Sequence, residues 1–330
     1  MKNSNGVAGL AGFTAACVII ATMQSAFATE KVWRHGILLP KADAGILMMV
    51  STQGFAEKRG LKIELVPMKD DPLLIRALLA GKLDSIEGGP AIAISAGSRN
   101  ADLKILGCHW PSLPHGVFVR NNIGSVQDLK GKTVAIAGPG GLPDVLMRAL
   151  FEKFSVPTSD INFASLGGDV ERFKALTVGV VDATVVSMEY VPVAAKSDVK
   201  LLVAARDVLP NYLRICIETT GSTLNARRND AIAFIAAEMS ALRYAMTHRE
   251  DAMHLTREMA HVSPNDPRPE FVFDDAVQHK SVDPDMPIPM EKLSWMQDQL
   301  IKIGTLKAPY DLAKIVDKEI RADALGIADR

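Results

Sequence analysis

The residues best suited to hold a ligand form one glycine loop, Gly138, Gly140 and Gly141. The loop follows a run of β-branched and small apolar residues, Thr133–Ala137, and precedes Pro143 and an apolar-periodic segment. This pattern predicts a strand, a tight turn and a helix with proline in its first turn, which is half of a βαβ unit. Free N–H groups and a positive helix end would then lie at the carboxyl edge of a sheet, where open α/β folds bind ligands.

Two nucleotide sites can be tested by counting along this stretch. A P-loop needs a glycine five residues before the Gly-Lys-Thr triplet at 131–133, where the chain has Val126, and the triplet precedes the predicted strand instead of following it. A dinucleotide fingerprint fits Gly138 and Gly140, but its third glycine falls on Pro143, which prevents close packing of helix on strand. The spacing excludes a P-loop and disfavours a dinucleotide site.

Other candidate contacts lie on loops that follow predicted strands. Trp110 is equally suited to stack on a flat ligand or to pack in the core, and His115 is more typical of a hydrogen-bonded structural histidine. Asp84 and Asp182 each follow a glycine-ended helix, so we expect them to stabilise turns through backbone hydrogen bonds. The predicted ligand-binding residues are Lys41, Asp43, Glu87, Gly88, Gly89, Trp110, His115, Gly138, Gly140, Gly141, Gly168, Asp169, Ser187, Glu189 and Tyr190.

Composition narrows the class of protein. A length of 330 residues exceeds what one hydrophobic core usually serves, which predicts two lobes. The net charge of −1 implies neither nucleic acid nor an anionic membrane as a partner. Aromatic residues are only 5% of the chain, so small polar organic ligands are favoured over sugars. No Cys/His cluster has the spacing of metal ligands, so we expect no metal site. We also expect no cofactor and no catalytic residue.

The first 28 residues have the pattern of a secretory signal peptide. A basic start is followed by an uncharged apolar run at 7–23 and a small-x-small site at 26–28, which predicts cleavage before Thr29. A single membrane anchor remains an alternative, although the apolar run is short for a span. Lipid attachment at Cys17 is disfavoured because the apolar run continues past it. The sequence therefore predicts export to the periplasm.

Hydrophobic patterning predicts two successive series of strands and helices. The first series has strands at 32–39, 61–66, 84–86 and 103–108, with helices at 44–59, 71–80 and 90–97. The second has strands at 133–137, 161–165, 182–186 and 199–204, with helices at 143–154, 169–178 and 188–196. A strand at 213–218, helices at 230–247 and 250–260, an ordered surface excursion at 261–289 and helices at 290–302 and 310–321 follow. Each series predicts a mainly parallel sheet covered by helices.

Three segments of the chain resemble one known family. Segments 77–84 and 175–183 look like its two strand entries, in which a helix, a glycine, a hydrophobic residue and an aspartate follow one another. Segment 126–135 is similar to the start of its second lobe. Together they resemble the periplasmic solute-binding proteins of ABC importers for aliphatic sulfonates, taurine, nitrate and thiamine-precursor pyrimidines. The resemblance covers roughly residues 31–260.

The resemblance implies an α/β, type II periplasmic-binding-protein fold. Lobe 1 would comprise 29–120 and 213–330, and lobe 2 would comprise 121–212, with a ligand cleft between lobes that close about two hinge crossovers. The implied function is that of a monomeric extracytoplasmic component that delivers a small molecule to the permease of an importer in the inner membrane.

Two other functions stay open. One enzymatic branch of the family uses a cysteine-rich motif that is absent here, and the adjacent pair Cys108-His109 would point to opposite faces of a strand. A pyrimidine-modifying or decarboxylase-like enzyme on this fold is therefore disfavoured. A periplasmic sensor subunit that docks on a receptor is the other alternative.

The family's strand order also bears on the cysteines left after cleavage. It would place the strand at 213–218 beside the strand at 103–108 and bring Cys216 near Cys108. Because adjacent paired strands rarely suit disulfide geometry, we expect two buried free thiols.

The charges of the candidate loops predict the charge of the ligand. Glycine loops at two helix starts favour an anion, each helix end contributing about half a charge. Asp43, Glu87, Asp169 and Glu189 lie in or beside the same loops, with Lys41 as the basic side chain among them. We therefore expect a ligand with a cationic or hydrogen-bond-donating nitrogen in preference to an inorganic oxyanion.

Overall fold

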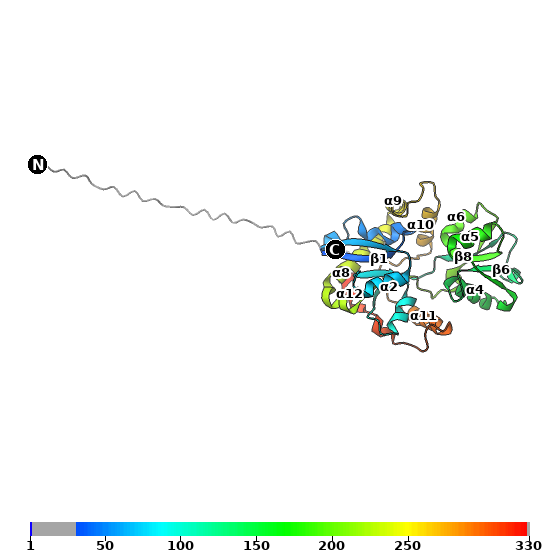
Figure 1. Ribbon diagram of the computed structural model, residues 1–330. Helices are drawn as coiled ribbons and strands as arrows, with labels where there is room; N and C mark the ends of the chain where they lie inside the picture. Colours follow the sequence, from blue (N-terminus) through cyan, green and yellow to red (C-terminus); the bar gives the residue numbers. More distant parts are fainter. Residues whose placement is uncertain (2–30, 329–330) are drawn as a thin grey trace. The chain divides into compact units, whose positions relative to one another are not determined.

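The computed structural model describes Met1 and residues 31–328 (Figure 1). The predicted cleavage site, the apolar run at 7–23 and Cys17 lie outside the described residues. The described chain forms two five-stranded sheets, each covered on both faces by helices, as the alternating pattern predicts.

The first sheet has the strand order β2-β1-β3-β10-β4. Its strands are β1 (Lys31–Leu38), β2 (Leu61–Met68), β3 (Ser85–Gly88), β4 (Lys104–Trp110) and β10 (Ile215–Thr219). β1 runs parallel to β2 and β3, whereas β10 is antiparallel to its neighbours β3 and β4. The carboxyl ends of β1, β3 and β4 carry candidate site residues.

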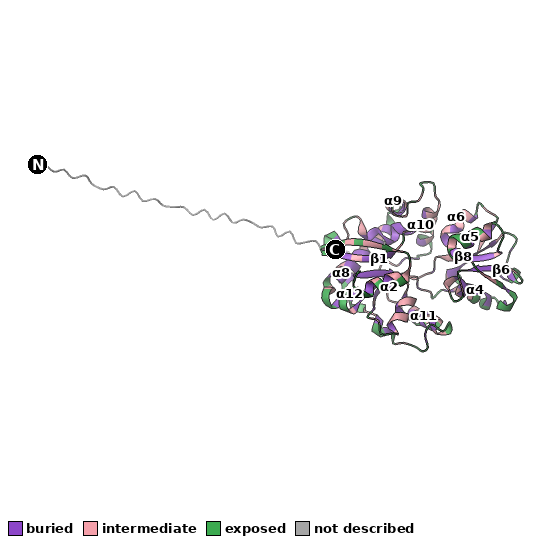
Figure 2. Ribbon diagram, viewed as in Figure 1, coloured by how far each residue is buried: buried purple, intermediate pink, exposed green. Residues whose placement is uncertain are grey.

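Two cores cover the faces of the first sheet. Side chains alternate between them, as Cys216 and Ile217 of β10 do. One core packs α1 (Ala44–Leu47), α8 (Gly221–Thr247), α9 (Arg249–Ala260) and α12 (Lys318–Leu325) on the sheet. The other packs α2 (Asp71–Leu79), α3 (Pro90–Gly97) and α11 (Met290–Lys302). Figure 2 shows the buried strands beneath these partly exposed helices.

The second sheet has the order β7-β6-β8-β5-β9. Its strands are β5 (His115–Arg120), β6 (Thr133–Ile136), β7 (Asn162–Ser165), β8 (Ala183–Ser187) and β9 (Val199–Ala204). α4 (Leu142–Lys153) and α7 (Ala205–Val208) pack on one face, and α5 (Asp169–Thr177) and α6 (Val191–Ala194) pack on the other (Figure 1). The opposite faces of one strand serve different cores, since Val185 of β8 packs with α4 and Val186 with α5.

Several elements differ from the sequence predictions. The helix expected over 310–321, for example, is replaced by a short 3-10 helix and by α12, which extends to Leu325. The helix expected over 44–59 breaks into α1, η1 (Met49–Ser51) and η2 (Glu57–Arg59), because Gln53 and Gly54 take left-handed backbone angles with φ of 56° and 70°. The ordered surface excursion expected at 261–289 includes a helix that was not predicted, α10 (Arg268–Gln278), whose Phe273 and Ala276 are buried in the core. Short 3-10 helices also occur at η3 (Gln127–Leu129), η4 (Thr158–Asp160), η5 (Met188–Tyr190) and η6 (Leu312–Ile315).

The turn roles predicted for two aspartates are confirmed. An oxygen of Asp84 accepts a hydrogen bond from the backbone N–H of Arg34 at 2.8 Å, and an oxygen of Asp182 accepts one from that of Thr133 at 2.9 Å. Asp84 thus ties the start of β3 to β1, and Asp182 ties the start of β8 to β6, so each aspartate joins two neighbouring parallel strands.

The chain changes sheet earlier than the sequence predicts. The first crossing was expected near Arg120, but β5 already pairs with β8 and β9 of the second sheet from His115 onward. The change of sheet therefore falls between Trp110 and His115. The strand β5 was not predicted because it is buried on both faces, so its sequence lacks the alternation of apolar and polar residues.

The prediction of two free thiols is wrong. Cys108 of β4 and Cys216 of β10 form a disulfide, with Cα atoms 3.9 Å apart. The two strands are neighbours, as the family's strand order implied, but their register shifts between Ile215 and Ile217. This irregularity in the ladder alters the side-chain directions on which the prediction relied.

Candidate functional site

A polar cavity of about 50 Å³, here called the polar chamber, lies between the two sheets. The first sheet contributes the loop after β1, the end of β4 and the residue before β10. The second sheet contributes the starts of β5 and α5 and the end of β8. The wall consists of Lys41, Ala42, Asp43, Trp110, Pro114, His115, Asp169, Ser187, Met188, Glu189, Arg214, Val272 and Asp275.

A larger cavity of about 180 Å³, the apolar chamber, adjoins the polar one. The two share Lys41, Asp43, His115 and Arg214, which therefore form the partition between them. The rest of its wall is mostly apolar and comprises Leu38, Leu39, Leu47, Met48, Asp71, Glu87, Gly88, Gly89, Leu113, Leu142, Tyr212 and Ile215.

The partition is built around one ion pair. Arg214, which precedes β10, donates through Nη2 to Oδ2 of Asp43, which precedes α1. The guanidinium also lies over the ring of Trp110, 4.4 Å from its centroid. Trp110 is 1% exposed, and its ring packs against the guanidinium of Arg214. The ion pair therefore joins the loop after β1 to the residue before β10, at the partition between the two chambers.

The second sheet presents its polar groups around Asp169. This carboxylate pairs with Arg172 one turn further along α5 and accepts a hydrogen bond from the backbone N–H of Ser187 at 3.1 Å. Arg172 in turn donates to the backbone carbonyl of Val185. Asp169 is therefore neutralised and fixed from its own sheet, and it holds the end of β8 against the start of α5.

Two cavity carboxylates have no such partner. Burial raises the pKa of Glu189, and the nearby Asp43 raises it further, whereas Arg268 and Lys41 act in the opposite direction. Burial is also the main cause that raises the pKa of Asp71 in the apolar chamber. For the described side chains, no ion pair within 4.0 Å engages Glu189 or Asp71. A ligand cation or N–H donor would satisfy them.

Histidines of the site are buried and partly unpaired. Burial lowers the pKa of His115 to about 4, with Asp169 opposing the shift and Arg214 reinforcing it, so the ring is neutral near pH 7. Behind the apolar chamber, Nε2 of His109 lies 2.9 Å from Oε1 of Glu87. The two atoms make no hydrogen bond, and Glu87 is 5% exposed, so it is a weaker candidate for ligand contact than the half-buried Glu189.

The glycine loops do not offer the free donors expected of them. The N–H of Gly140 donates to Asp144 at 2.8 Å, and the N–H of Gly141 donates to the carbonyl of Gly138. Acidic side chains of the same helices thus occupy N–H groups that an anionic ligand would need. The local geometry favours a neutral or cationic group at these loops.

The predicted site residues fall into three groups. Those that line the two chambers are Lys41, Asp43, Glu87, Gly88, Gly89, Trp110, His115, Asp169, Ser187 and Glu189. Gly140 lines a separate apolar cavity beside α11. Gly138, Gly141 and Gly168 are not among the lining residues of these cavities, and Tyr190 packs on Phe173 in the core, 4.5 Å between ring centroids.

Sequence reasoning missed several lining residues. Arg214 was assigned to the predicted strand at 213–218 and Asp71 to a helix start, so only the strand order could place their side chains at the site. Val272 and Asp275 come from α10, which lies in a segment for which no helix was predicted. Asp275 is paired with Arg206 at 3.0 Å, so it adds no free charge.

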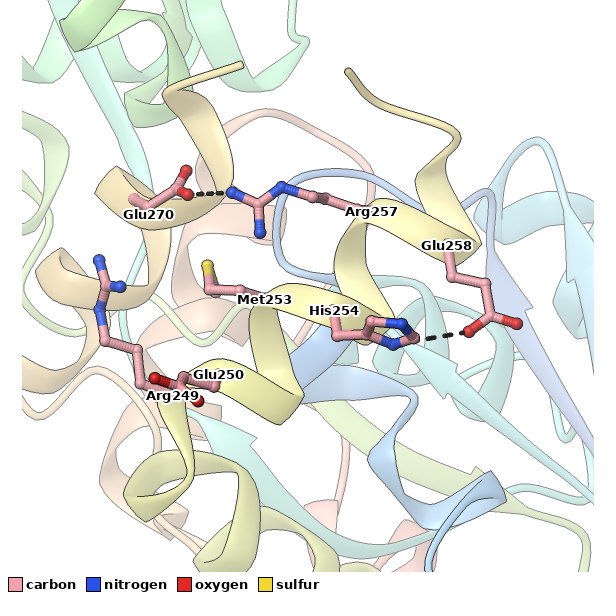
Figure 3. Close-up of a pocket in the computed structure, with 7 residues that line it drawn as sticks. All are labelled: Arg249, Glu250, Met253, His254, Arg257, Glu258 and Glu270. Atoms are coloured by element: carbon pink, nitrogen blue, oxygen red, sulfur yellow. Dashed lines mark hydrogen bonds and ion pairs between the residues drawn. The ribbon is translucent and has the colours of Figure 1, made fainter. Parts of the chain in front are cut away.

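The largest of these hollows is a surface groove of about 600 Å³ along α9 and α10 (Figure 3). Most of its charged side chains are paired within the groove or beside it. Figure 3 shows Arg257 paired with Glu270 and His254 3.9 Å from Glu258. Arg249 pairs with Asp274 beside the groove. The groove contains none of the predicted site residues. Size is therefore a poor guide to the site here.

Two further properties concern only the residues that the structure describes. None of their helices is long and apolar enough to cross a membrane. Their His, Cys, Asp and Glu side chains form no group of three or more that could hold a metal ion.

Comparison with solved structures identifies the fold. The periplasmic aliphatic sulphonate binding protein SsuA from Escherichia coli is 20% identical, with a TM-score of 0.71 over 87% of this chain and 92% of that chain. The periplasmic nitrate-binding protein NrtA from Synechocystis PCC 6803 is 14% identical, with a TM-score of 0.68 over 91% of this chain and 89% of that chain. The predicted periplasmic-binding fold is therefore confirmed.

The fold is also shared with a protein crystallised with a different kind of compound. A mutant of DSZB, in complex with biphenyl-2-sulfinic acid, is 15% identical, with a TM-score of 0.71 over 90% of this chain and 99% of that chain. Among curated proteins, none matches this sequence. The family model described as NMT1/THI5 like matches residues 42–252, which is more than half of the chain. This chain belongs to the NMT1/THI5-like family.

Proposed function

We propose that the protein is the extracytoplasmic solute-binding component of an ABC-type importer. It captures a small polar organic molecule between its two sheets and delivers it to a membrane permease. The observation that carries the proposal is the pair of adjoining chambers at the carboxyl ends of strands from both sheets. The structural likeness to SsuA and NrtA supports it.

The proposed mechanism is closure of two lobes on the ligand. One lobe holds the first sheet with the C-terminal helices, and the other holds the second sheet. Only two connections, 111–114 and 205–214, join the sheets along the chain. Small-angle scattering should show compaction on saturation with ligand, and unchanged dimensions would argue for a rigid site.

The same proposal includes the charge of the ligand. Glu189 is half-buried without a cationic partner among the described side chains, and the helix-start donors at Gly140 and Gly89 already face Asp144 and Asp71. A ligand with an amine or another N–H donor would stabilise these carboxylates. An inorganic oxyanion would add a further negative charge to a site that already has unpaired ones.

A thermal-shift screen of the mature protein against a metabolite library would find the ligand, because binding to the folded state raises the melting temperature. Calorimetry should then show that an amine-bearing compound binds far more tightly than nitrate or sulfate. Glu189→Gln should weaken it by about tenfold or more. Glu319→Gln is the matched control, since Glu319 is 84% exposed and remote from the chambers. Tight nitrate binding that survives Glu189→Gln would refute the charge argument.

We propose a binding protein and not an enzyme. Cys108 and Cys216 are joined to each other, so neither supplies the thiolate that nucleophilic catalysis by cysteine needs. Chemical turnover of the bound compound, followed by mass spectrometry, would overturn this part of the proposal.

Export is the remaining part. The signal-like start predicts that the mature chain begins at Thr29 in the periplasm. The intact mass of the exported protein should correspond to cleavage after Ala28. An uncleaved amino terminus, or lipid on Cys17, would contradict it.

A further inference from the structure

The apolar chamber adjoins the separate cavity beside α11, whose volume is about 150 Å³. The two share Leu142 of α4 and Tyr212, and the far wall is formed by Trp295 and Met296 of α11. Three cavities therefore follow one another, from the polar chamber through the partition at Asp43 and Arg214 to an apolar end. A compact polar solute would use only the first of them.

Hydrogen-bonding groups at the polar end remain unpaired. Nε1 of Trp110 and Nη1 of Arg214 are buried, and neither has a hydrogen-bond acceptor among the described residues. Both are obligate donors, because indole and guanidinium nitrogens carry hydrogen and no lone pair that accepts. Trp110 is almost fully buried, so leaving its N–H unpaired is costly unless a ligand supplies an acceptor.

The opposite demand comes from the second sheet. Glu189 is an acceptor without a cationic partner among the described side chains, and it lines the same polar chamber as Trp110 and Arg214. A head group that satisfies all three must carry both an acceptor, such as a carboxylate, and a donor, such as an ammonium. A group with only one of these would leave part of the chamber unsatisfied.

We propose that the ligand is a small amphiphilic zwitterion. Its head group occupies the polar chamber between Arg214 and Glu189, and its unbranched apolar chain passes the partition and lies beside Leu142 and Tyr212. This inference rests on the proposed solute-binding function and adds the class of ligand. An amphiphilic ligand fits a wall that changes from charged residues in the polar chamber to mostly apolar residues in the two cavities beyond it.

A homologous series of straight-chain 2-amino acids, from three to eight carbons, tests the chain. Calorimetry with the mature protein should show affinity rising about three- to fourfold for each added methylene that reaches the apolar chamber. Leu142→Trp fills the passage shared by the two apolar cavities and should abolish this dependence while the shortest member still binds. Val178→Trp is the matched control, because Val178 is 66% exposed at the end of α5.

The head group is tested with primary alkylamines and fatty acids of matched chain length. Each lacks one half of the zwitterion and should bind at least tenfold more weakly than the amino acid. An affinity independent of chain length would overturn the inference and leave a polar solute as the ligand of the proposed importer component. Equal binding of the alkylamine would overturn the zwitterion. If no compound of a metabolite library bound, the proposed function itself would fail.

Discussion

The two sheets have the same topology but different interiors. When only the parallel strands are counted, the second along the chain stands at the edge of each sheet, followed by the first, the third, an antiparallel strand and the fourth. The antiparallel strand, β10 or β5, is the first strand after a crossing between the sheets. The two sheets thus share one strand order, and the helix, glycine and aspartate that precede β3 in the first sheet precede β8 in the second.

The interiors do not follow the repeat. The first sheet and its helices bury Glu218, Glu238, His35 and His109 together with the disulfide. The buried polar side chains of the second sheet, such as Arg172 and Thr184, donate to backbone carbonyls. Topology places the loops of both sheets at one site. Because the first sheet buries these ionisable groups, we expect its stability to respond more to substitution and to pH.

Removal of the disulfide should have the largest effect. The bridge closes a segment with a sequence separation of 108, which contains the whole second sheet. Cys108→Ala with Cys216→Ala should lower the free energy of unfolding by about 2–5 kcal/mol in urea titrations. A reductant should destabilise the natural protein and leave the double variant unchanged. Equal unfolding midpoints for the natural protein and the double variant would show that the bridge does not stabilise the first sheet.

The two turn aspartates come next. Asp84 accepts from the backbone of Arg34 and also pairs with the side chains of Arg34 and Arg227, whereas Asp182 accepts from the backbone N–H of Thr133. Asp84→Ala should therefore lower the free energy of unfolding by about 3 kcal/mol and Asp182→Ala by about 1 kcal/mol. Equal losses would show that the arginines add nothing to the repeated turn.

Glu218 should make the first sheet sensitive to pH. Burial raises its pKa well above the ordinary value of 4.5, with Asp71 adding to the shift. The folded state therefore keeps this proton when the unfolded state has lost it, and stability falls as pH rises above 4.5, by at most about 1.36 kcal/mol per pH unit.

The variant Glu218→Gln removes that proton exchange. Its free energy of unfolding, measured by denaturant titration from pH 4.5 to 8, should decline less steeply with pH than that of the natural protein. Asp160→Asn in the exposed turn before β7 provides a control from the second sheet. Parallel profiles for the natural protein and Glu218→Gln would contradict the assignment.

The smallest effect is expected in the glycine loop of the second sheet. A Cβ at Gly138 would meet nothing within 4 Å, so Gly138→Ala should change stability by less than about 0.5 kcal/mol. Gly140 has a φ of 75°, and Gly140→Ala should cost about 1 kcal/mol. Thermal denaturation of both variants measures the difference. A large loss of stability for Gly138→Ala would indicate that other residues pack against this loop.

Much of the fold could be predicted because the signals are local. Alternation of strands and helices follows from short-range hydrophobic periodicity, and Asp84 and Asp182 follow from turn chemistry a few residues long. Candidate loops were found for the same reason, since a residue after a strand lies at the sheet edge whatever its neighbours are. The break at Gln53 and Gly54 was missed because Ile46, Met49 and Val50 before it have the spacing of one apolar helix face.

The remainder was decided by residues far apart in the chain. The Asp43 to Arg214 partition, the bridge from Cys108 to Cys216 and the contribution of α10 all require β10 to lie beside β3 and β4 and the C-terminal helices to return to the site. Sequence by itself determined which residue types stand on which loops, because that depends on local propensity. Only the tertiary structure decided which charges neutralise one another and which face the ligand unpaired, because pairing depends on distances that strand order and register set.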